Sequence, residues 1–251
     1  MSQETITSPP SATRVALALL LPITGAIVFS LLASGGVALS SGSQGSYALL
    51  FAGLALTSWF VGWRWYGLKG LGLRGGRPLT ASIGFATLVW LAFLVVRLFT
   101  VEVNSYGTPD GGRTFIYTLL FEAFCTQLWV YGLFFRAVAD WRGPLTAAIS
   151  SGILFGAVAF LLFQESYALL ASGLIYFVVW GVTYGVIRLR TGSMLGSAIV
   201  QALQIWTGWY VLAPTDPVST DQLRNLYLIA SIVYLVIIWR LWPKEQSDYR
   251  V

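Results

Sequence analysis

The chain has 251 residues, of which 57% are hydrophobic and only 10% are charged. Soluble domains carry roughly 25% charged residues, so this composition indicates a protein whose solvent is lipid. The formal charge of +5 lies in short segments between apolar runs, which argues against a nucleic-acid-binding face. No histidine is present, which excludes histidine-ligated metal sites and histidine general bases. We therefore expect neither a metal nor a cofactor.

Polar and apolar segments alternate along the chain in a regular way. Residues 1–14 are polar and include Pro9 and Pro10, which predicts a disordered segment. Residues 243–251 form a polar tail, and 15–242 are expected to form a single transmembrane domain. Eight runs in this domain have the length needed to span a bilayer: 15–32, 47–65, 81–100, 114–138, 145–163, 167–187, 194–211 and 224–242. The predicted fold class is an all-α polytopic bundle with about eight transmembrane helices.

The basic residues predict the orientation of this bundle. Alternate inter-helix segments on one side hold twelve of the cations, Arg14, Arg64, Lys69, Arg74, Arg77, Arg136, Arg142, Arg188, Arg190, Arg240, Lys244 and Arg250. The other side holds only three, Arg97, Arg113 and Arg224. By the positive-inside rule both termini are expected to be cytoplasmic. We interpret Arg188 and Arg190 as orientation determinants that contact anionic lipid.

Three motifs frame the fourth to seventh predicted helices. The first reads Tyr131-Gly132-Leu133-Phe134-Phe135-Arg136 and is followed by a Gly143-Pro144 turn. The second ends in Phe155-Gly156, and the third follows Thr191-Gly192-Ser193 and includes Gln201 and Ile205. The set resembles the CPBP family, which contains the CAAX prenyl endopeptidases and Abi-type proteins. The resemblance implies an intramembrane-protease fold with its core in helices 4–7, and a prokaryotic plasma-membrane location.

The same resemblance implies that the catalytic residues have been replaced. The glutamate pair of the family falls on Tyr131 and Gly132, and its two histidines fall on Ala159 and Gln201. Its asparagine falls on Ile205, so only Arg136 is retained. Tyrosine has a free pKa near 10 and is a poor base at neutral pH. Loss of a whole catalytic constellation removes several powers of ten in rate. We expect no peptidase activity by the family mechanism.

Two groups of polar residues are candidates for other roles. Glu122 is the one acid well inside a predicted helix, and we expect it to pair with Arg97 at a similar depth on the third helix. The alternative is ligand or proton handling by Glu122. The second group is a possible neutral ligand pocket formed by Gln127, Tyr131, Arg136, Gln201 and Gln204. Interhelical hydrogen bonding is the favoured alternative for these residues, and Arg136 can also pair with Asp140.

Three functions remain open from the sequence. The favoured one is a pseudoenzyme, a non-catalytic CPBP-fold protein that binds, regulates or scaffolds a membrane partner or an amphiphilic ligand. The second is a CPBP-type intramembrane endopeptidase with atypical active-site residues, using Glu122 or Glu165. The third and weakest is a transporter, because we find one intramembrane acid and no internal repeat.

Overall fold

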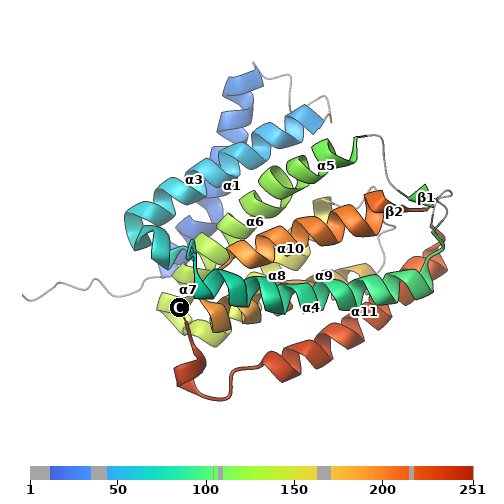
Figure 1. Cartoon of the computed structure of the whole chain (residues 1–251). Coiled ribbons are helices and arrows are strands. Elements are labelled where there is room, and N and C mark those ends of the chain that lie inside the picture. Colours follow the sequence, from blue (N-terminus) through green and yellow to red (C-terminus); the bar gives the residue numbers. More distant parts are fainter. Residues whose placement is uncertain are drawn as a thin grey trace, which may run out of the picture.

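A computed structural model of the chain describes residues 12–34, 44–103, 105–106, 110–162, 171–214 and 218–250. This part of the chain forms eight helical segments that follow one another in the predicted order (Figure 1). They are α1 (Ala12–Ser34), α3 (Gln44–Gly70), α4 (Arg77–Thr100), a continuous helix from α5 to α7, α8 (Pro144–Leu162), α9 (Ala171–Thr191), α10 (Leu195–Ile205) extended by η3 (Trp206–Val211), and α11 (Thr220–Leu241). The predicted all-α polytopic bundle is confirmed.

Six of the described helices are long and apolar enough to cross a membrane, and α3 and α10 are not among these six. The outer surface of the bundle carries large apolar side chains. Phe99 is 87% exposed, Leu32 80% and Trp239 71%. Soluble proteins rarely expose contiguous apolar surface of this kind. The bundle is therefore an integral, multi-pass membrane protein in which lipid covers these side chains.

The fourth helix is widened by two π-helical stretches. It begins as α5 (Gly111–Tyr117), continues through η1 (Thr118–Phe124), α6 (Cys125–Gln127) and η2 (Leu128–Phe134), and ends as α7 (Phe135–Arg142). π-Helical turns inside α-helices occur frequently at functional sites. In this chain η2 contains Tyr131 and Gly132, the positions of the family's glutamate pair.

Helices α8 and α9 approach each other closely because glycines face each other across the interface. A Cβ atom on Gly156 would lie 2.6 Å from the Cα of Val178, and a Cβ on Gly152 would overlap the backbone of Val182. Gly181 in turn faces the carbonyl oxygen of Gly152. Small residues allow this close packing, which drives helix association where no hydrophobic effect operates.

Helix α10 lies between the fourth helix and α4, and it contacts both of them (Figure 1). At one end of the bundle, β1 (Ser105–Tyr106) pairs with β2 (Leu212–Ala213) in antiparallel register. At the other end, connections from distant parts of the chain meet. The backbone N–H of Met194 donates to the Gly72 carbonyl at 3.0 Å, and that of Arg250 donates to the Leu189 carbonyl at 2.8 Å. We call this the basic end, because it gathers the connections that carry most of the arginines.

Two predicted boundaries change at the termini. Helix α1 begins at Ala12 rather than at residue 15, so residues 12–14 of the segment expected to be disordered are helical. Residues 1–11 lie outside the described part of the chain. The tail forms a short 3₁₀ turn, η4 (Gln246–Asp248), and docks on the end of α9. Asp248 supports this docking through its contact with Arg190, at 3.7 Å between Oδ1 and Nη2.

Candidate functional site

The positions of the three motifs lie in the buried interior of the bundle. Tyr131 and Gly132 come from η2, Ala159 from α8, and Gln201 and Ile205 from α10. All five residues are buried, and the Tyr131 side chain is fully so. A Cβ on Gly132 would lie 3.2 Å from the Leu71 carbonyl oxygen, so the glutamate that the family has here would meet the backbone of the loop after α3.

Two glutamines pair at the centre of this region. Gln127 Nε2 donates to Gln201 Oε1 at 2.7 Å, and both side chains are buried. The predicted juxtaposition of Gln127 and Gln201 is therefore present. Gln127 Oε1 has no hydrogen-bond partner among the described residues. The bond joins the fourth helix to α10 at the position where the family has a histidine.

Tyr131 is fixed by a hydrogen bond and by ring contacts. Its hydroxyl donates to the Gly181 carbonyl at 2.6 Å. Its ring lies 5.9 Å from that of Phe155 and 6.4 Å from that of Tyr184, measured between centroids. The phenol proton is engaged with a backbone carbonyl and the ring is packed among other rings, so Tyr131 acts as a structural element of the core.

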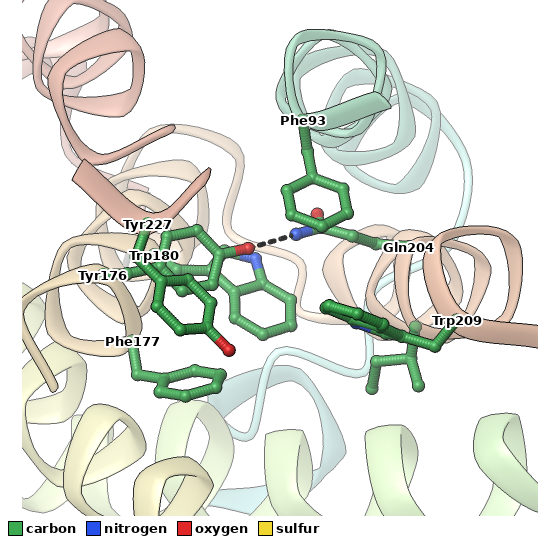
Figure 2. A pocket seen from close by; sticks show the side chains of 8 residues that line it. Phe93, Tyr176, Phe177, Trp180, Gln204, Trp209 and Tyr227 are labelled. Atoms are coloured by element: carbon green, nitrogen blue, oxygen red, sulfur yellow. Dashed lines mark hydrogen bonds between the residues drawn. The ribbon is translucent and has the colours of Figure 1, made fainter. Parts of the chain in front are cut away.

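An aromatic cavity lies next to this centre, between α4, α9, α10 with η3, and α11 (Figure 2). Its walls are Phe93, Tyr176, Phe177, Trp180, Gln204, Ile205, Trp209 and Tyr227. The cavity is small. The centre of a water molecule can move within about 20 Å³ of it, so it has room for about one water. Figure 2 shows the rings surrounding the Gln204 amide.

Gln204 is the main polar group in this cavity. Its Nε2 donates to the hydroxyl of Tyr176 at 2.9 Å and to that of Tyr234 at 3.0 Å. Its Oε1 has no hydrogen-bond partner among the described residues. Of the five predicted pocket residues, only Gln204 lines this cavity. The sequence missed the aromatic walls, although Tyr176, Trp180 and Tyr184 recur at a spacing of four on α9 and so share one helix face.

The predicted ion pair between Glu122 and Arg97 is not among the ion pairs of the described residues. The guanidinium of Arg97 donates to three backbone carbonyls, those of Val101 at 2.8 Å, Leu212 at 2.8 Å and Gly208 at 3.3 Å. The physical reason is that α10 and η3 lie between α4 and the fourth helix, and the open carbonyls at the end of η3 attract the arginine. Glu122 lies close enough to Tyr117 and Tyr210 to act on both electrostatically.

The two arginines of the basic end differ from each other in environment. Arg136 pairs with Asp140 at 3.0 Å, as one of the predicted alternatives has it, and its Cζ lies 5.9 Å from the Tyr66 ring centroid. Arg136 therefore lies apart from the aromatic cavity. Arg188 was interpreted as an interfacial lipid contact, but it is fully buried between α3, η2 and α9.

The side chains at the motif positions are neutral. Within the described ranges no three residues among Cys, Asp and Glu gather as metal ligands would. The motif positions hold a phenol, amides and apolar groups, which form neutral hydrogen bonds and ring contacts. Fold and centre together define a polytopic membrane helix bundle with a closed, neutral core at its motif positions.

Comparison with known families supports a more specific assignment. Residues 87–207, from α4 into η3, match the family described as "Type II CAAX prenyl endopeptidase Rce1-like". This match supports the CPBP (CAAX protease-like) family that the motifs predicted. Searches among curated proteins and among solved structures find no match to the chain.

Proposed function

We propose that this chain is a non-catalytic CPBP-fold protein of the prokaryotic plasma membrane, which acts as a scaffold or regulator by binding a membrane partner. The observation that carries the proposal is the pairing of Gln127 with Gln201 beside the buried Tyr131. By the family resemblance, Tyr131 and Gln201 fall where active relatives have a glutamate base and a histidine. A neutral amide pair can hold two helices together, but it cannot activate water.

The geometry gives little support to an endopeptidase that uses Glu122. Glu122 lies nine residues before Tyr131 on the fourth helix, a separation of about two turns or more. Its electrostatic neighbours include Tyr117 and Tyr210. A general base has to lie within hydrogen-bond reach of the water that attacks the scissile carbonyl. Glu165, the other candidate, lies outside the described residues.

An amphiphilic ligand is the second candidate occupant, and the aromatic cavity favours it. Gln204 Oε1 is a buried acceptor without a donor among the described residues, at the wall of a cavity made mostly of rings. Ligand sites have this composition, with apolar walls and a few oriented polar groups. The cavity holds only about one water, so a larger ligand would require the rings of Trp180 or Trp209 to move.

Gentle purification followed by mass spectrometry tests the proposal. The full chain is extracted from its native membrane in mild detergent, and every protein and small molecule retained is quantified. The scaffold proposal predicts a protein partner in stoichiometric amount, retained equally by Gln204→Leu. A small molecule that is retained by the unmodified chain and lost on Gln204→Leu would select the cavity ligand instead. A chain that purifies with neither contradicts both forms of the proposal.

The expected orientation has its own test. The basic end gathers the connections that the positive-inside rule assigns to the cytoplasm. A reporter that is active only in the cytoplasm is therefore expected to be active when it is fused after Val251. An extracytoplasmic reporter signal at this position would reverse the proposed topology.

A further inference from the structure

The basic end contains a buried cation whose donors are only partly used. Arg188 is fully buried; its Nε donates to the Tyr131 carbonyl at 3.2 Å and its Nη2 to the Gly70 carbonyl at 3.1 Å. Its Nη1 is also buried and has no hydrogen-bond partner among the described residues. Leaving a buried charged donor without an acceptor is costly. The Arg188 Nη1 group therefore needs a hydrogen-bond acceptor.

Two further donors in the same region lack acceptors. Arg136 Nε and the Tyr66 hydroxyl are both buried, and neither has a hydrogen-bond partner in the described part of the chain. The Arg136 guanidinium lies over the Tyr66 ring, so these two donors lie close together. All three unpaired groups can donate, and two of the three belong to guanidinium ions.

Positive charge exceeds negative charge around these unpaired donors. Arg74 and Arg136 both act electrostatically on Arg188, and both are cations. Arg14, Arg136 and Asp140 act on Tyr66. Asp140 is therefore the one carboxylate among these described neighbours, and it already pairs with Arg136. An anion from outside the described residues would balance the excess positive charge.

The arginines are held in place before any ligand arrives. Gly72 has φ of 79°, and a Cβ atom on it would lie 2.5 Å from Arg188 Nε, so only glycine allows the loop to pass this close to the guanidinium. Arg74 Nε donates to the Lys69 carbonyl at 2.9 Å, and the Arg188 Cζ lies 5.3 Å from the Phe135 ring centroid. The last carbonyls of α3 thus anchor Arg74 and Arg188.

We propose that the basic end binds a phosphate group through Arg188, Arg136 and Tyr66, with Arg74 adding to the local positive charge. A phosphate offers several acceptor oxygens to donors that approach from different sides, and guanidinium groups bind it with charge-assisted hydrogen bonds. Arg74 and Arg136 are partly exposed, so a ligand can reach both from outside the bundle. The phosphate can belong to an anionic lipid headgroup or to a soluble compound. This site is separate from the aromatic cavity, and the inference does not depend on the proposed function.

Ligand-induced stabilisation of the detergent-solubilised full chain tests the site. Three probes are titrated: dihexanoyl phosphatidylglycerol, inorganic phosphate and dihexanoyl phosphatidylcholine. The last has the same chains and a phosphate, but no net charge. The expected result is a rise in Tm with phosphatidylglycerol and none with phosphatidylcholine. A similar rise with inorganic phosphate would assign the site to a soluble phosphate compound rather than to a lipid.

Variants assign the effect to the named residues. Arg136→Gln is expected to weaken binding about tenfold, the loss that corresponds to one charge-assisted hydrogen bond. Tyr66→Phe is expected to weaken it less. Arg190→Gln is the matched control, because Arg190 also ends α9 but bonds the Leu241 carbonyl and Asp248 instead. The proposal is overturned if neither anion stabilises the unmodified chain. It is equally overturned if Arg136→Gln and Tyr66→Phe bind as tightly as Arg190→Gln does.

Discussion

The motif centre and the basic end are both buried and polar, but the groups that carry their unpaired atoms differ in charge. In and beside the motif centre the unpaired atoms include the amide oxygens of Gln127 and Gln204, which are neutral acceptors. At the basic end they are donors on Arg136, Arg188 and Tyr66, and two of these groups are cations. One water can satisfy a neutral amide oxygen, whereas buried cations require an anion. The first region is thus a core, and the second is a binding site.

The largest effect is expected for Arg188→Met, which removes the donor to the carbonyls of Gly70 and Tyr131. Each buried carbonyl left without a donor costs about 1–3 kcal/mol, so the loss of unfolding free energy should be about 2–5 kcal/mol. Thermal unfolding in detergent measures it. Arg190→Met, the control at the same helix end, should cost less than about 1 kcal/mol because that side chain is partly exposed. Equal losses of unfolding free energy for Arg188→Met and Arg190→Met would contradict the distinction between a buried cluster and its exposed rim.

The glutamine pair offers a double-mutant cycle for the motif centre. Gln127→Leu or Gln201→Leu alone leaves the other amide buried without its partner. The double variant removes both amides and should recover part of the stability, with a coupling energy of about 0.6–2 kcal/mol. Additive single effects would mean that the pair does not join the fourth helix to α10.

A smaller effect is expected for Tyr131→Phe. This change removes the hydrogen bond to the Gly181 carbonyl and keeps the ring contacts with Phe155 and Tyr184. The expected loss is about 0.5–1.5 kcal/mol, measured by the same thermal unfolding. Phe155→Tyr, a neighbouring aromatic change that adds a hydroxyl without a designated acceptor, is the comparison variant. A loss for Tyr131→Phe above about 3 kcal/mol would indicate more than one neutral hydrogen bond at this position.

The smallest effect concerns the tail that closes the basic end. The backbone N–H of Lys244 holds the pKa of Asp248 below its usual value, and the N–H of Glu245 and the charges of Arg190 and Arg250 add to this. Because the folded-state pKa is lowered, the contribution is present at neutral pH and is lost as pH falls through the lowered pKa. Hydrogen exchange at the Arg250 amide, which bonds the Leu189 carbonyl, should accelerate in that acidic range relative to its intrinsic rate. Asp248→Asn should remove this pH dependence.

The sequence predicted the helices well because length and hydropathy alone determine a spanning segment. It assigned Gln127 and Gln201 to one polar group because the family resemblance places Gln201 in the core of the bundle, and a hydrogen bond joins these two residues. It failed for Arg188, because an arginine at a helix end has the same pattern whether lipid or protein surrounds it. It also predicted an ion pair between Glu122 and Arg97 that is not among those of the described residues, because equal depth in the membrane does not reveal that α10 lies between them. Hydropathy has no period that distinguishes η2 from an ordinary α-helix, so the π-helical turns were not predicted.

Hydrolysis of a prenylated CAAX-type peptide by the full chain in proteoliposomes tests the central claim, that the motif centre is a neutral core. The positive control is a family member with an intact Glu-Glu-x-x-x-Arg motif, and protein-free liposomes give the background rate. The account predicts a rate for this chain equal to that background, unchanged by Tyr131→Phe or Gln201→Leu. Cleavage above background that is lost in either variant would contradict it, because these side chains would then take part in the chemistry.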